Sequence, residues 1–365
     1  MMSRAVVGWE SAEPVPDGYQ FNDYLAVRHG RLFLRDIDLA SFFVDEGVLP
    51  GVTGSLPSPM EIVYLPKIGE KIAGMREIFA AVKEEVGYEG EFYYAYASKA
   101  NAAEEVIRST LAAGAHHEMS STVDVTIAEL MIARGLLKPE KMIIANGFKA
   151  AGSDYAANLI QLKDKHDNLI PVIEDLGEIS PFLTSGKQFE VGLRFKCYSP
   201  DPEEIKNSTV ESRFGLDEEG LWKAAGYIGA APGLTLKMFH AMVGGQITDR
   251  ESFVARLEPT LELYAQMKRR YPSLSIFNFG GGMPAAMTLD FEFDYADFWR
   301  MLLTKTQEIC ATYQIEVPDI MGELGRYTTS EHGAHLFKII TVKDNNSAYP
   351  WYIINGSIMS SFPDS

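Results

Sequence analysis

A short apolar run followed by a helical pattern recurs along most of this chain, and this alternation constrains the fold more than any other feature of the sequence. The runs are Phe92–Ala97, His117–Ser121, Met142–Asn146, Leu169–Glu174, Val191–Lys196, Leu234–Met242, Leu274–Phe279 and Ile320–Glu323. Helical patterns fill the intervals between them, and strands that alternate with helices are typical of a parallel sheet. Eight such units over about 230 residues predict a closed (β/α)8 TIM barrel. An open doubly wound sheet is the alternative.

Both flanks differ from this middle part. Residues 1–75 contain short extended-looking pieces broken by the Pro/Gly-rich segment LPGVTGSLPSP, and residues 331–365 return to strand-like runs. We therefore expect a barrel over residues 76–330 and an accessory β domain formed from both chain ends, 1–75 and 331–365. No helix or strand follows the final SSFPDS, so we expect the C-terminal part of that β domain to be incomplete.

Composition excludes several classes of protein. Hydrophobic residues make up 46% and charged residues 23%, as in an ordinary globular protein. The net charge of −17 argues against a nucleic-acid partner, whose phosphates need a basic surface. It is compatible with a small cationic substrate, although an acidic solubilising surface is the simpler explanation.

The sequence also carries few signs of export or of a membrane. No stretch approaches the ~18 uncharged apolar residues of a membrane span, and the N-terminus lacks the apolar core of a signal peptide. These features favour the cytoplasm and predict no membrane partner. Cys197 and Cys310 lie in apolar-patterned segments and are expected to be buried thiols.

Glycines and an arginine follow the last two apolar runs. Gly280, Gly281 and Gly282 come directly after the seventh run, and Arg326 follows the eighth. Loops after strands seven and eight of such barrels often hold phosphate, glycines let backbone N–H groups come close to it, and arginine can pair with it bidentately. A plain turn would also explain three glycines, but the position together with Arg326 favours a phosphate site.

Lys99 stands at the end of the first run and Glu323 at the end of the eighth. A lysine amine at the mouth of a barrel can become a nucleophile that forms a Schiff base with an aldehyde. A cofactor that bears both an aldehyde and a phosphate is pyridoxal 5'-phosphate (PLP). A carboxylate facing its pyridine nitrogen would keep that nitrogen protonated, which suits decarboxylation. The residues therefore predict a PLP-dependent carboxy-lyase.

These motifs resemble the alanine racemase-like (fold type III) PLP decarboxylases, and within them the biosynthetic arginine decarboxylases. The segment VGYEGEFYYAYASKAN is similar to the family's stretch that ends at the cofactor lysine, here Lys99. Asn146–Lys149 (NGFK), Val191–Lys196 with Arg194, ESRFGL, FNFGGG and GELGRY resemble further family motifs, and the terminal INGSIMSSFPDS resembles the arginine-decarboxylase branch. The resemblance implies that Arg194 lies near the cofactor, that Glu323 faces the pyridine nitrogen and that Arg326 binds the phosphate.

Three departures from the family pattern stand out. Met242 occupies the position of the family's ring-stacking histidine and Gly245 that of its phosphate-binding serine, while His240 lies two residues earlier on the same face. Leu324 replaces a proline. Family chains also continue beyond the equivalent of Ser365 with a segment that contributes to the site across a dimer interface. We therefore count His240, Met242 and Gly245 as candidate cofactor contacts and expect a homodimer or higher homo-oligomer.

The resemblance implies decarboxylation of a basic amino acid, first of all arginine to agmatine and CO2 for polyamine synthesis. Lysine, ornithine or diaminopimelate are alternative substrates, and a catalytically impaired paralogue with a regulatory role is an alternative function. Glu118 and Asp124 match acidic positions of the family near the lysine or the substrate, or serve as solvated or capping carboxylates. His332 and His335 have a spacing suited to metal, but no third ligand is evident, so we expect no metal site.

Overall fold

The computed structural model describes residues 16–44, 58–197, 212–288, 291–343 and 351–357. The chain divides into two compact units: residues 65–285 with 293–330 form one, and residues 1–64, 286–292 and 331–365 form the other. The boundary expected between residues 75 and 76 falls inside helix α2 (Pro66–Val86), which belongs wholly to the first unit.

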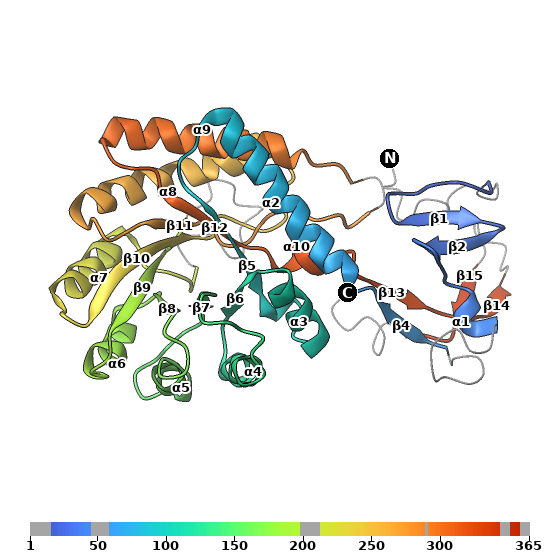
Figure 1. Ribbon diagram of the computed structural model, residues 1–365, viewed down its shortest axis with the longest axis horizontal. Coiled ribbons are helices and arrows are strands. Elements are labelled where there is room, and N and C mark those ends of the chain that lie inside the picture. The colour runs from blue at the N-terminus through green and yellow to red at the C-terminus, as the bar shows by residue number, and fades with distance from the viewer. Residues whose placement is uncertain (1–15, 45–57, 198–211, 289–290, 344–350, 358–365) are drawn as a thin grey trace. The chain divides into compact units, whose positions relative to one another are not determined.

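The first unit is a closed barrel of parallel strands, as predicted, with helices around it (Figure 1). The strands follow the order β10-β11-β12-β5-β6-β7-β8-β9, and the pairing of β12 with β5 closes the ring. Their bounds are β5 (Phe92–Ala97), β6 (His116–Met119), β7 (Ile143–Ala145), β8 (Leu169–Ile173), β9 (Phe189–Phe195), β10 (Leu234–Ala241), β11 (Ile276–Asn278) and β12 (Asp319–Glu323). Each predicted run thus overlaps one strand, and the ends differ by at most two residues.

Helices connect these strands. They are α2, α3 (Glu104–Ala112), α4 (Thr122–Ala133), α5 (Asp154–Leu162), α6 (Ile179–Thr184), α7 (Glu218–Ala230), α8 (Arg250–Arg270), α9 (Tyr295–Tyr313) and α10 (Gly325–Thr329). Several begin at a side chain that accepts a hydrogen bond from a backbone N–H of the first turn, namely Ser121, Ser153, Asp217, Asp249 and Asp294. Such caps satisfy donors that have no partner within the helix.

Apolar side chains fill the barrel interior from its N-terminal side. Side chains alternate between the two faces of a strand, so one set packs inside the barrel and the other packs against the helices. The inner set comprises Ala95, Met142, Ile144, Ile170, Val172, Met238, Ile276 and Met321, all buried. This packing closes the lower part of the barrel and leaves the C-terminal ends of the strands for polar side chains.

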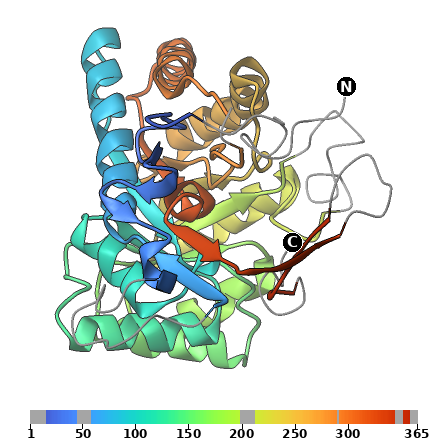
Figure 2. The same ribbon diagram turned by 90° about the vertical axis from the view of Figure 1, so that its right-hand side faces the viewer.

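The second unit contains small antiparallel sheets from both flanks of the chain. Strands β1 (Leu25–Arg28), β2 (Arg31–Leu34) and β3 (Ile37–Asp38) form one sheet, followed by helix α1 (Ser41–Val44). Strand β4 (Met60–Val63) pairs with β13 (Gly333–Leu336), which joins the two flanks as predicted. Strand β14 (Ile339–Lys343) pairs with β15 (Trp351–Ile354), drawn in dark red in Figure 2. Among the helices that the structure describes, none has the length and apolar character needed to cross a membrane.

Candidate active site

Polar side chains occupy the inward positions at the C-terminal ends of the barrel strands. Met321 lies in the interior core, and Glu323, two residues later, therefore points to the same side. The same step of two residues leads from Ile144 to Asn146, from Met238 to His240 and from Ile276 to Asn278. The strand period thus brings together residues that are distant in the sequence.

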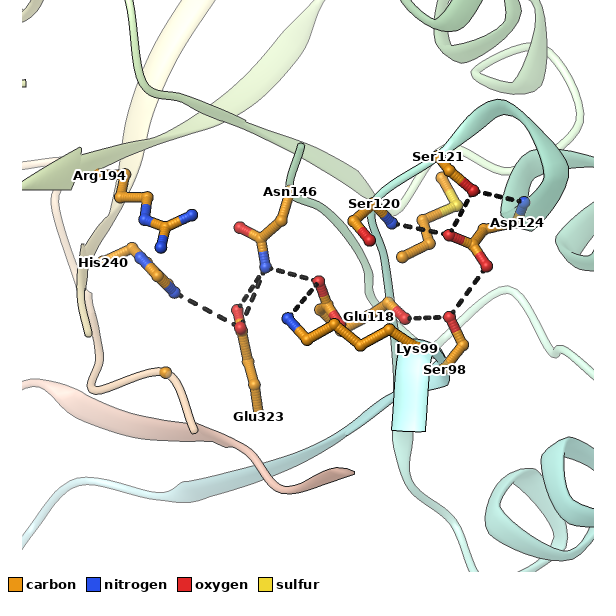
Figure 3. A network of polar contacts seen from close by, with 12 residues as sticks. Ser98, Lys99, Glu118, Ser120, Ser121, Asp124, Asn146, Arg194, His240 and Glu323 are labelled. Carbon is orange, nitrogen blue, oxygen red and sulfur yellow. Dashed lines mark hydrogen bonds and ion pairs between the residues drawn. The ribbon is translucent and has the colours of Figure 1, made fainter. Parts of the chain in front are cut away.

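Glu323 is the centre of this polar group (Figure 3). Its side chain is 4% exposed, and its carboxylate accepts hydrogen bonds from Asn278 Nδ2 at 2.8 Å and from Asn146 Nδ2 at 3.0 Å. His240 Nε2 lies 3.4 Å from Glu323 Oε2, and the His240 ring is also buried. The backbone N–H of Glu323 donates to the carbonyl of Gly280, which joins β12 to the loop of Gly280, Gly281 and Gly282, the glycine loop.

A second buried carboxylate, Glu118 of β6, lies beside Glu323. Asn146 Nδ2 donates to Glu118 Oε1 at 2.8 Å, so one amide contacts both carboxylates. Lys99 Nζ lies 3.8 Å from Glu118 Oε1, and the Lys99 side chain is 62% exposed. Lys99 belongs to the short 3-10 helix Ser98–Ala100 that follows β5, and its side chain points toward this pair (Figure 3).

The two carboxylates have opposite charge preferences. Burial favours the neutral form of Glu323, but His240, Lys99 and the hydrogen bond from Asn146 together outweigh it and lower the pKa of Glu323 to about 2. Burial, together with the negative charge of Glu323, raises the pKa of Glu118 to about 7, although Lys99 opposes the rise. Titratable groups driven apart in this way are characteristic of functional sites.

Arg194 lies on β9 at the mouth of the barrel but is paired with protein groups. Its Nη1 lies 3.3 Å from Glu174 Oε2, and its guanidinium lies 4.6 Å from the ring centre of Phe214. Next to it, Lys149 and Glu178 form a fully buried ion pair at 3.7 Å. Burial lowers the pKa of Lys149, and Glu178 opposes that shift. These four charges support the strand ends around Asn146.

The glycine loop follows β11 and packs closely on its neighbours. Gly280 and Gly282 have φ values of 69° and 96°, and a Cβ on Gly282 would lie 2.4 Å from the carbonyl oxygen of Gly244. A Cβ on Gly280 would lie 3.0 Å from Met242 Sδ. The conformation of the chain thus requires glycine at two of the three positions. Met242 borders the loop, and Gly245 is exposed.

The segment after β12 brings Arg326 near the end of β5. A Cβ on Gly325 would lie 3.0 Å from the carbonyl oxygen of Ala97, so the start of α10 packs against the strand that leads to Lys99. Arg326 is exposed. The backbone N–H of Leu324 donates to Ala95 O at 2.9 Å, a hydrogen bond that a proline at this position does not make.

The structure joins Lys99 to Glu323 and His240 through Glu118 and Asn146, and Asn278 gives Glu323 a second amide donor. The two asparagines were not among the predicted site residues. Asn146 and Asn278 supply the amide donors, and both were visible in the NGFK and FNFGGG motifs. A polar residue two positions after a buried apolar residue on a barrel strand was the signal. Asp124 accepts hydrogen bonds from Ser120 N and Ser121 Oγ at the start of α4, and its other oxygen accepts one from Ser98 Oγ at 3.2 Å, directly before Lys99. Of the other quoted motifs, Glu211 and residues 358–365 lie outside the described residues.

Comparison with known proteins places this site in a family. A biosynthetic arginine decarboxylase from Prochlorococcus marinus is 22% identical over 300 residues, which cover 78% of this chain and 46% of that protein. A diaminopimelate decarboxylase structure from M. jannaschii has a TM-score of 0.75 at 21% identity and covers 93% of this chain and 74% of that one. A biosynthetic arginine decarboxylase structure from Campylobacter jejuni has a TM-score of 0.70 at 19% identity and covers 88% and 53%.

The chain spans less than half the length of the curated relatives that it matches. Its barrel, by contrast, is matched over nearly its whole length. Residues 72–330, more than half of the chain, match the family model of the pyridoxal-dependent decarboxylase, pyridoxal binding domain. This chain therefore belongs to the family of pyridoxal-dependent decarboxylases, whose pyridoxal-binding domain its barrel forms.

Proposed function

We propose that this chain carries the PLP site of a decarboxylase for a basic amino acid, with arginine as the first candidate substrate and agmatine and CO2 as products. The observation that carries this proposal is Glu323, a buried carboxylate whose lowered pKa keeps it ionised at the end of β12, in one network with the residues around Lys99. The relatives named as arginine decarboxylases support the choice of arginine.

The described residues carry the chemical groups that binding of PLP requires. Lys99 offers an accessible amine, and Glu118 Oε2 and Asn146 Oδ1 are buried atoms that make no hydrogen bond within the described residues. Glu323 offers the negative charge that a protonated pyridine nitrogen requires. Arg326 and the backbone N–H of Gly281 are the candidates for binding the phosphate. Arg326 is exposed, and Gly281 has no side chain that would cover its backbone N–H.

Each residue then has a task in the reaction. PLP, when bound, supplies an electron-accepting ring for the electron pair that remains when the bond between Cα and the carboxylate breaks. Lys99 would hold the cofactor through its amine and yield that position to the amine of the substrate. Glu323 would hold the pyridine nitrogen protonated. His240 and Asn278 would keep the Glu323 carboxylate oriented and charged, and we assign no direct cofactor contact to Arg194, which Glu174 already pairs.

Release of CO2 from carboxyl-labelled arginine, lysine, ornithine and diaminopimelate tests the proposal. We expect release from one basic amino acid, with arginine first, and a loss of at least a hundredfold in kcat for Glu323→Gln, since an amide does not stabilise a protonated pyridine. Exposed Glu105 provides the matched control, because Glu105→Gln is expected to change kcat little. Release from none of the four amino acids would contradict the proposal.

A second candidate function is a decarboxylase-like chain that binds a partner and regulates rather than catalyses. One observation favours it: the Met242 thioether borders Gly280 at the mouth of the barrel, where the family motif carries a histidine. The double variant Met242→His/Gly245→Ser distinguishes the two functions. Gly245 has open space around its Cβ position, so the serine fits without strain. CO2 release by the double variant alone would favour the second candidate.

A further inference from the structure

Two buried carboxylates in the barrel mouth share a single amide donor. The Nδ2 group of Asn146 carries two N–H bonds and lies within 3.0 Å of both oxygens of Glu323 and 2.8 Å from Glu118 Oε1. Glu118 is 0% exposed and Glu323 is 5% exposed. Two like charges at one buried site are costly, so one carboxyl of such a pair tends to hold a proton.

The surroundings of the two carboxylates are unequal. Glu323 receives a second amide donor, Asn278, and has the imidazole of His240 at 3.4 Å. Glu118 has Lys99 at 3.8 Å, on a side chain that is largely solvated, and Glu118 Oε2 makes no hydrogen bond within the described residues. An ionised Glu118 would therefore leave a buried negative oxygen without a donor, which costs free energy.

We propose that the two carboxylates share one proton, that Glu118 holds it while Glu323 stays ionised, and that Glu118 is thereby a positioning residue that keeps negative charge away from Lys99. The Asn146 amide joins the two groups in both charge states, because it donates to a carboxylate and to a carbonyl oxygen of a carboxylic acid alike.

Except for Lys99, every charged group that faces Glu118 favours a protonated Glu118 beside an ionised Glu323. Glu323 from β12 and Asp124 from α4 disfavour a second negative charge, and Lys99 after β5 favours one. His240 from β10 acts on Glu323, its direct partner. The rise in the pKa of Glu118 shows that burial and Glu323 outweigh Lys99.

The consequence concerns the amine of Lys99. An ionised carboxylate at 3.8 Å would stabilise the ammonium form, which is not a nucleophile. A protonated Glu118 removes this attraction from the amine of Lys99. This consequence deepens the proposed function and rests on it, whereas the position of the proton is a property of the chain itself.

Carbon-13 NMR of the full chain with labelled glutamate carboxyl groups, recorded without cofactor over a pH series, tests the inference. Difference spectra of Glu118→Gln and Glu323→Gln assign the two resonances. We expect the Glu118 resonance to titrate near neutrality and the Glu323 resonance to remain ionised throughout. Titration of Glu118 at the ordinary pH of a glutamate, or titration of Glu323 near neutrality, would overturn the inference.

Glu105, an exposed residue of α3, provides the control. Glu105→Gln is expected to leave the Glu118 titration unchanged. Should Glu118→Gln fail to fold, Glu118→Asp identifies the same resonance by its displacement. Borohydride trapping of PLP on the same samples separates the two proposals: trapping at Lys99 with an ordinary Glu118 overturns this inference alone, and a shifted Glu118 without trapping overturns the proposed function alone.

Discussion

His240 Nε2 lies 3.4 Å from Glu323 Oε2, with both side chains buried at the C-terminal end of the barrel. Because His240, with Lys99 and Asn146, lowers the pKa of Glu323 from 4.5 to about 2, the folded chain binds this proton less tightly than the unfolded chain. The stabilisation, on the order of 3 kcal/mol, is complete above pH 4.5 and is lost as the pH falls toward 2. We expect His240→Phe to lose resistance to acid, so that its unfolding midpoint, followed by circular dichroism, moves to higher pH. An unchanged midpoint would contradict the assigned role of His240.

His117 gives a pH dependence of the same direction from a basic group, whose charged form burial disfavours. It is buried on β6, neither ring nitrogen makes a hydrogen bond within the described residues, and burial lowers its pKa from 6.5 to about 4. The folded chain therefore loses stability as the pH falls from 6.5 to 4, by about 3 kcal/mol. His117→Phe removes this penalty, and we expect its unfolding free energy in urea to fall less over that pH range than that of the wild type. A steeper fall would show that the imidazole gains a partner on protonation.

The barrel could be predicted from the sequence because each strand is a compact apolar run. Phe92–Ala97 is both the predicted run and the observed strand β5. Lys99 and Glu323 could be predicted as candidates because they lie at the ends of such runs. The roles of Asn146 and Asn278 could not be assigned in this way. Each amide acts by donating to the carboxylate of Glu323 on another strand, and only closure of the barrel brings amide and carboxylate together.

The first unit begins at residue 65, before the start expected for the barrel at residue 76, and the sequence pattern gave no sign of this extension. Residues 66–86 form one continuous helix, α2, whose buried side chains include Ile72 and Phe79 on either side of the expected boundary. A helix that precedes the first barrel strand carries no strand signal of its own. Its place in the first unit follows from its packing against α3 and against α9, which is distant in the sequence.

The buried pair of Lys149 and Glu178 gives a prediction on stability. Glu178 Oε1 and Oε2 also accept backbone N–H bonds from Lys149 and Glu174, so the pair fixes the loops after β7 and β8. Lys149→Met would leave a buried carboxylate without its cation and is expected to cost about 3–5 kcal/mol in urea unfolding. The double variant Lys149→Met/Glu178→Gln should cost less than Lys149→Met alone. Equal losses would contradict a direct pairing of the two charges.

Glycine at position 282 gives a prediction on the loop itself. A Cβ at Gly282 meets Gly244 O at 2.4 Å and its φ is 96°, so Gly282→Ala is expected to destabilise the fold by about 1–3 kcal/mol. Gly74 in α2 is the matched control, because its Cβ position meets no atom within 4 Å. Gly74→Ala is expected to raise the unfolding free energy by up to about 1 kcal/mol. Stabilisation by Gly282→Ala would contradict the described loop.

Lys99 carries the central claim, because the proposed chemistry requires its amine to hold PLP. The most direct measurement is borohydride reduction of the chain with PLP, followed by peptide mapping by mass spectrometry. We predict that the pyridoxyl label lies on the peptide that contains Lys99, that Lys99→Ala abolishes it, and that Lys138→Ala, at an exposed lysine, retains it. A label on other lysines, or an equal label in Lys99→Ala, would contradict the assignment of this barrel mouth as the cofactor site.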